Sequence, residues 1–172
     1  MKEHTIAIPR ALDLRASLKW ASSLFCSPHA DRYWLDFKEM GWIEPFPLLF
    51  LASNIRRFKA MKSTSEFRAK NFQEHGYAAH MGFFRSLKLD FGNEPGEAKG
   101  SDTYLPITIL SIRELQKEAS QKTVHTGQLL ENHALQLARL LTREDKSDLI
   151  DTLTYTLREI MRNAASLRPI AE

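Results

Sequence analysis

The hydrophobic periodicity of this 172-residue chain changes character near residue 110. Before that point, short alternating runs such as Tyr33, Leu35 and Phe37 are separated by segments whose apolar residues lie three and four positions apart. The first pattern is typical of strands and the second of helices. Beyond that point only the helical spacing remains. The sequence therefore predicts an α/β layer fold for residues 1–110, followed by an all-helical extension over residues 111–172.

Capping and turn signals give the expected bounds of these elements. Asp13 is a natural N-cap for the first helix, and Pro45 suits a first helical turn, where its missing N–H would have no partner. Pro106 removes one donor, so the run 103–110 is expected at a sheet edge. The expected strands cover 5–8, 33–37, 66–72 and 103–110, and the expected helices cover 14–25, 46–60, 75–87 and three segments within 112–164.

Composition and charge exclude several classes of protein. The 24 basic and 21 acidic residues leave a net charge of +3, which is too mild to indicate nucleic-acid binding by itself. The single cysteine, Cys26, cannot form an internal disulfide, which fits a reducing compartment. No signal peptide is evident, and the most apolar stretch, 42–55, is shorter than the roughly 20 residues that span a bilayer. A cytoplasmic protein without a membrane segment is expected.

Residues 35–52 read LDFKEMGWIEPFPLLFLA. This segment resembles the centre of STAS-like domains, the fold of the anti-sigma-factor antagonists, in which a strand ends in a tight turn and a helix begins at that turn. The resemblance covers residues 5–110 and implies a mixed sheet with helices. Residues 77–86 are similar to bacterial proteins that join such a module to a histidine-kinase-type ATPase.

The turn departs from the family where regulation would occur. Phosphorylatable antagonists place an acidic residue and then a serine at this helix N-terminus, where phosphate meets free N–H groups and the positive end of the helix dipole. Here Glu44 is followed by Pro45 and Phe46, and proline has no hydroxyl. We therefore expect Glu44, Pro45 and Phe46 to form an interaction site rather than a phosphorylation switch.

Residues 153–165 read LTYTLREIMRNAA. The segment resembles the N-box helix of the GHKL ATPases, the superfamily that includes the histidine kinases and DNA gyrase. Glu159 and Asn163 carry the resemblance, and their spacing places both on one helix face. It implies that Glu159 is the catalytic base that activates water, and that Asn163 binds Mg²⁺ on the triphosphate of ATP.

The resemblance stops after Asn163. The chain continues as Ser166-Leu167-Arg168-Pro169 where the family has an acidic residue, His and Ser. The Asp-x-Gly-x-Gly turn that reads adenine and the glycine-rich lid do not follow. We interpret residues 111–172 as the incomplete start of an ATPase domain, and expect no cofactor for this chain alone, although the complete family domain takes ATP and Mg²⁺.

One segment, residues 56–70, concentrates basic and aromatic residues. Such a combination could contact a phosphate backbone and stack bases, but a solvated helix end is the favoured interpretation because cations stabilise a helix C-terminus. No metal-ligand spacing such as His-x-x-x-His occurs. The basic residues are Arg56, Arg57, Lys59, Lys62, Arg68 and Lys70.

Three functions remain open. The first is a regulatory protein-interaction module of bacterial signalling, which docks on a protein partner or on a second copy of itself. The second is an ATPase or protein kinase whose missing loops come from another chain, so the chain is an enzyme only in that case. The third, nucleic-acid binding through residues 56–70, ranks last.

Overall fold

The computed structural model describes residues 1–11, 13–41, 44–100, 104–142 and 147–166. The chain forms two compact units, described here separately. The N-terminal unit comprises Met1–Lys99 with Pro106–Thr108, and the C-terminal unit comprises Gly100–Leu105 with Ile109–Glu172. Whether these are independent domains that divide at residue 110 stays a prediction. No helix among the described residues is both long and apolar enough to cross a bilayer.

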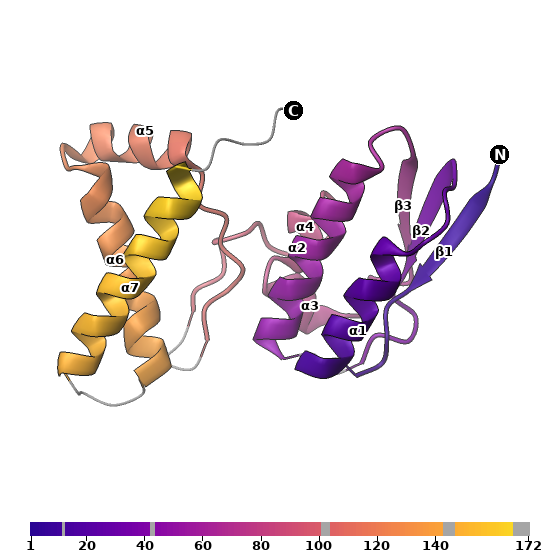
Figure 1. Ribbon diagram of the computed structural model, residues 1–172, viewed down its shortest axis with the longest axis horizontal. Helices are drawn as coiled ribbons and strands as arrows, with labels where there is room; N and C mark the ends of the chain where they lie inside the picture. The colour runs from indigo at the N-terminus through magenta and orange to yellow at the C-terminus, as the bar shows by residue number, and fades with distance from the viewer. Residues whose placement is uncertain (12, 42–43, 101–103, 143–146, 167–172) are drawn as a thin grey trace. The chain divides into compact units, whose positions relative to one another are not determined.

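The N-terminal unit is built on three parallel strands in the order β1-β2-β3. Helix α1 connects the first pair of strands and helix α2 connects the second, and both lie on the same side of the sheet (Figure 1). This arrangement follows from right-handed crossovers, which return each strand parallel to the one before. The bounds are β1 Glu3–Ala7, α1 Leu14–Phe25, β2 Arg32–Asp36, α2 Pro45–Met61 and β3 Glu66–Lys70.

The predicted α/β class is confirmed, but the mixed sheet is wrong for the described residues, where every strand pairing is parallel. The expected edge strand at 103–110 is reduced, over its described part 104–110, to a single β-bridge residue, Tyr104. The backbone of this segment bonds to loops instead: the Ile107 N–H donates to the Met81 carbonyl, and the Ile107 carbonyl accepts from the Gly96 N–H. These bonds use the groups that a neighbouring strand would need.

Alternation along β2 sends one set of side chains into the core, as the sequence predicts. Tyr33 and Leu35 are buried within the strand, and Phe37, which follows it, is also buried. They face the inner side of α2, which contributes Leu51 and Phe58. The Tyr33 and Phe58 rings meet edge to face at 5.1 Å between centroids. This contact joins the sheet to its helical layer.

The expected helix over 75–87 is two short helices, α3 (Gly76–His80) and α4 (Phe83–Ser86). Gly82 separates them with a φ of 78°, which a helix cannot contain. The break turns Phe83 and Phe84 into an aromatic cluster at the carboxyl end of β2. The cluster consists of Phe37, Phe72, Phe83, Phe84 and Phe91.

The C-terminal unit is helical, as expected: α5 (Ile112–Lys122), α6 (Thr126–Thr142) and α7 (Ser147–Ser166). Its core contains Leu115, Ala119, Leu129 and Leu130, with Met161 of α7 packed against them. Not all residues of the apolar stripe that predicts α7 are buried: Leu149, Ile160 and Ala164 are exposed. The only buried residue among the described side chains of α7 is Thr154.

Thr154 carries a buried hydroxyl with no hydrogen-bond partner among the described residues. Such a group loses its bonds to water on folding, so Thr154→Val is expected to raise the free energy of unfolding by about 1 kcal/mol. Urea unfolding followed by far-UV circular dichroism measures the change. The matched control is Thr152→Val, because the exposed Thr152 hydroxyl donates to the Asp148 carbonyl at 2.8 Å. A loss of stability in Thr154→Val, or equal effects in both variants, would contradict the expectation.

Candidate interaction surface

Helix α2 begins at the turn that the sequence singles out. Glu44 is the N-cap residue with extended backbone angles, and its side chain makes no capping hydrogen bond. Pro45 occupies the first helical position, where its missing N–H leaves no gap in the helix. The predicted helix from Phe46 to Ala60 is thus confirmed to within one residue at each end. Glu44, Pro45 and Phe46 are all exposed.

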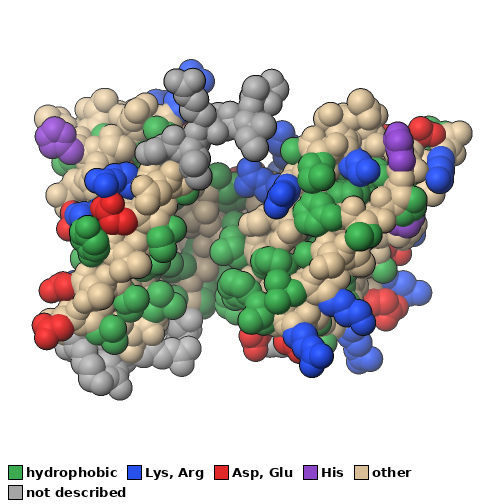
Figure 2. Space-filling view, viewed as in Figure 1, with side chains coloured by type: hydrophobic (Ala, Val, Ile, Leu, Met, Phe, Trp, Pro, Cys, Tyr) green, Lys and Arg blue, Asp and Glu red, His purple; other side chains and the backbone are tan. Residues whose placement is uncertain are grey.

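Apolar side chains surround this turn without being buried. On α2, Phe46 is 55% exposed and Leu49 47% exposed, and the Phe46 ring stacks on Phe50. On α1, Leu14 and Leu18 are 55% and 51% exposed. We call Leu14, Leu18, Phe46 and Leu49 the α1/α2 apolar surface. Figure 2 shows hydrophobic side chains gathered over this helical layer.

The topology explains why these residues gather. In parallel strands that share a sheet, all carboxyl ends lie at one edge, and each following helix starts there. The first turns of α1 and α2 therefore lie at the same end of the helical layer. Leu14 and Leu18 belong to the apolar pattern that predicts α1, but the buried side of α1 is formed by Ser17, Trp20, Ala21 and Leu24. The sequence of α1 thus carries two sets of apolar residues, one buried against the sheet and one exposed. The exposed set could have indicated a second contact surface.

The strand order at this edge of the sheet differs from that of α/β proteins that bind small molecules in a crevice. In open α/β sheets, small molecules bind where the strand order reverses and the connections leave in opposite directions. The order β1-β2-β3 has no such reversal, and both helices cover one face. Among the described residues, no group of three or more side chains is arranged to hold a metal ion. This geometry is suited to surface contact.

The predicted basic segment does not form one surface. Arg56 and Arg57 are exposed on α2, and the Arg57 guanidinium lies 5.4 Å from the centre of the Phe25 ring. Lys59 Nζ donates to the Leu87 carbonyl at 3.0 Å. Burial, and secondarily the charge of Lys88, lowers the pKa of Lys59 below its ordinary value. Lys59 is thus a packing residue as much as a surface charge.

The other basic residues point elsewhere. Lys62 lies 6.0 Å from the centre of the Phe58 ring. Arg68 and Lys70 project from β3 on the side of the sheet opposite to α2, where Arg68 pairs with Glu66 at 2.5 Å and Lys70 pairs with Asp36 at 3.2 Å. A helical layer and the far side of a sheet cannot contact the same stretch of nucleic acid. Nucleic-acid binding through this segment stays a prediction that the geometry does not favour.

Glu159 and Asn163 lie one turn apart on α7, in the C-terminal unit. The Glu159 carboxylate pairs with Arg162 Nη2 at 2.7 Å and with Arg158 Nη2 at 3.5 Å. Arg158 also pairs with Glu131 of α6 at 3.5 Å, so the group links two helices. The Asn163 side chain is exposed. Catalytic roles for Glu159 and Asn163 stay predictions.

Comparison of the chain with family models, with curated proteins and with solved structures gives no match in any of the three. The resemblances to STAS-like domains and to GHKL ATPases therefore rest on the sequence segments alone.

Proposed function

We propose that this protein is a regulatory protein-interaction module, and that the α1/α2 apolar surface contacts its protein partner. The observation that carries the proposal is the exposure of Phe46 and Leu49 at the start of α2 together with Leu14 and Leu18 at the start of α1. Large apolar side chains exposed together at one end of a helical layer are typical of contact sites on proteins. In this proposal the N-terminal unit is a STAS-like domain that acts in cytoplasmic bacterial signalling.

The chemistry of the α2 N-terminus supports a partner held by apolar contacts. Pro45 cannot be phosphorylated, and the first position of the helix presents a rigid apolar ring instead of a hydroxyl. Phe46 stacks on Phe50 with an interplanar angle of 24°, so its ring has a fixed support. An aromatic ring ordered before binding loses little side-chain entropy when a partner covers it. Phe46 is accordingly the anchor of the proposed contact.

The C-terminal unit has a separate place in the proposal. In the proposal it corresponds to the start of a GHKL ATPase domain and has a regulatory role. The ion pairs of Glu159 with Arg158 and Arg162 support a structural role for that carboxylate.

The test compares proteins that co-purify with the full chain and with variants from the cells that produce it, quantified by mass spectrometry. Phe46→Ser is expected to reduce recovery of the partner by at least roughly tenfold, because loss of an aromatic anchor costs about 2 kcal/mol or more. Met61→Ser is the matched control, since Met61 is 60% exposed at the other end of the same helix. Equal recovery with wild type and both variants would remove the proposal.

A further inference from the structure

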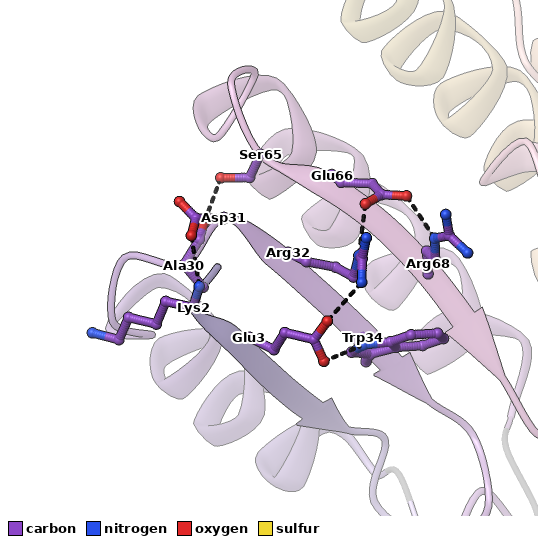
Figure 3. Close-up of polar contacts among 9 residues, drawn as sticks. All are labelled: Lys2, Glu3, Ala30, Asp31, Arg32, Trp34, Ser65, Glu66 and Arg68. Carbon is purple, nitrogen blue, oxygen red and sulfur yellow. Dashed lines mark hydrogen bonds and ion pairs between the residues drawn. The ribbon is translucent and has the colours of Figure 1, made fainter.

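The sheet of the N-terminal unit has a second face that neither α1 nor α2 covers. Alternate residues of each strand project from it, and Figure 3 views part of this face with the helices behind the strands. Strand register arranges these residues in three rows across the sheet. We call them the outer face: Glu3, Arg32 and Glu66 in the first row, Thr5, Trp34 and Arg68 in the second, and Ala7, Asp36 and Lys70 in the third.

An uncovered face is unusual for this kind of sheet. Parallel sheets occur almost always with both faces packed against other structure. Here a tryptophan, Trp34, stands at the centre of the open face, and its indole N–H donates to Glu3 Oε2 at 3.2 Å (Figure 3). Large aromatic side chains in such positions are typical of contact sites.

The charges of the outer face are ordered. Arg32 pairs with Glu3 and with Glu66, each at 2.6 Å, and Glu66 also pairs with Arg68, so one chain of ion pairs crosses all three strands (Figure 3). Hydrogen bonds from Arg68 and Arg32 hold the pKa of Glu66 below its ordinary value.

The opposite row holds a second ion pair. Asp36 accepts from Asn71 Nδ2 at 2.8 Å and pairs with Lys70 at 3.2 Å. The acidic residues Glu3, Glu66 and Asp36 thus balance the basic residues Arg32, Arg68 and Lys70. Both the first and the third row therefore contain acidic and basic residues, and the outer face as a whole has no net charge.

We propose that the outer face binds the outer face of a second copy of this chain, around a twofold axis that crosses the strands at the level of Trp34. Such an axis turns the strands of the second copy end for end. Arg32 of one copy then meets Asp36 of the other, and Glu66 meets Lys70, each pair occurring twice by symmetry. Trp34 lies against Trp34 at the centre.

The charge pattern selects this axis over its alternative. A twofold axis parallel to the strands would place Arg32 on Arg32 and Glu3 on Glu66, and like charges in contact are destabilising. The crossing axis leaves one contact between like charges, Arg68 on Arg68, and Arg68 is 54% exposed and neutralised by Glu66 within its own copy. Charge complementarity therefore identifies a second copy as the occupant and also gives its orientation.

The size of the face sets the expected strength. Three strands of five residues offer a surface of about 14 by 17 Å. This is small compared with the surface buried in tight dimers, so the expected dissociation constant is on the order of 100 µM. This association uses the side of the sheet opposite to the α1/α2 apolar surface, so it does not depend on the proposed function.

Sedimentation velocity of the full chain, from about 10 µM to about 1 mM, tests the proposal. Wild type is expected to change from monomer to dimer over this range, and Trp34→Lys to remain monomeric with an unchanged circular dichroism spectrum. Met61→Lys, at an exposed position of the helical layer outside the α1/α2 apolar surface, is the control and should dimerise like wild type. A monomeric wild type at the highest concentration, or a Trp34→Lys variant that dimerises normally, would overturn the proposal.

A mixing experiment tests the charge pairing and the axis. Glu66→Lys and Lys70→Glu each place like charges opposite one another in their own homodimers, so each variant alone is expected to associate at least roughly tenfold more weakly than wild type. The first variant has lysine at both of these positions and the second has glutamate at both, so an equimolar mixture restores opposite charges at both contacts. Recovery of dimer only in the mixture supports the proposed axis. A mixture that stays monomeric overturns it.

Discussion

Gly92→Ala is expected to destabilise the N-terminal unit by about 3 kcal/mol or more, a large part of the stability of a domain this size. Gly92 has a φ of 83°, in the left-handed region that costs a residue with a Cβ about 1 kcal/mol. The larger cost is steric, because the added Cβ would lie 2.6 Å from Ala79 Cα and 2.7 Å from the Ala79 carbonyl carbon. Both are backbone atoms of α3, which cannot move aside as a flexible side chain can.

Relief of this clash would break a further contact. The loop containing Gly92 is held to α3 by the Asn93 N–H, which donates to the Ala79 carbonyl at 3.0 Å, and by Asn93 Nδ2, which donates to the His80 carbonyl at 3.2 Å. Moving the loop away to admit a methyl group would stretch both bonds. The variant therefore loses stability in either case. If the loop stays in place the backbone is strained, and if the loop moves these hydrogen bonds are weakened.

Gly96 provides a matched control. Its φ is also 83°, but the one described atom within 4 Å of a Cβ there would be Thr108 Cγ2, at 3.8 Å. Gly96→Ala is expected to cost about 1 kcal/mol, the conformational term alone. Urea unfolding followed by tryptophan fluorescence reports on this unit, since all the tryptophans of the chain lie within residues 1–99. Similar losses in the two variants would show that the contact with Ala79 is not the cause.

The elements with a strong local pattern could be predicted from the sequence. The alternation of Tyr33, Leu35 and Phe37 fixes which side of β2 is buried, and the proline at position 45 fixes where α2 begins. The run 103–110 has strand-like composition, yet its Ile107 backbone groups are used by Met81 and Gly96. Such a bond between distant segments leaves no local pattern, so local propensity predicted the wrong element there.

The candidate site was predictable only in part. The exposed turn at Glu44, Pro45 and Phe46 follows from local sequence, whereas Leu14 and Leu18 join it only because parallel strands bring two helix starts to one edge. The outer face could not be predicted from any single segment of the sequence, because its residues come from three strands. Except for Glu66 with Arg68, its ion pairs join residues about thirty positions apart or more, such as Arg32 with Glu3 and Glu66, and depend on strand register.

Phe84→Ala is expected to lower the free energy of unfolding by about 3 to 5 kcal/mol, the range typical of Phe→Ala at fully buried positions in proteins. Phe84 has no exposed surface, and its ring contacts those of Phe37, Phe83 and Phe72 at centroid distances of 5.3, 5.1 and 5.5 Å. Alanine would leave a cavity lined by rings whose edge-to-face contacts it removes. Unfolding in urea, followed by tryptophan fluorescence, measures the loss.

The position of Phe84 is expected to make this loss of stability larger than the cavity alone would cause. Phe37 follows β2 directly, while Phe72 and Phe91 lie in the segment after β3, so the Phe84 ring fastens that segment to the sheet. Phe84→Leu keeps most of the volume and is expected to cost less than about 1.5 kcal/mol. Phe46→Ala, at an exposed ring, should change stability by less than about 0.5 kcal/mol. If Phe84→Ala were as mild as Phe46→Ala, the aromatic cluster would not be what holds residues 71–91 against the sheet.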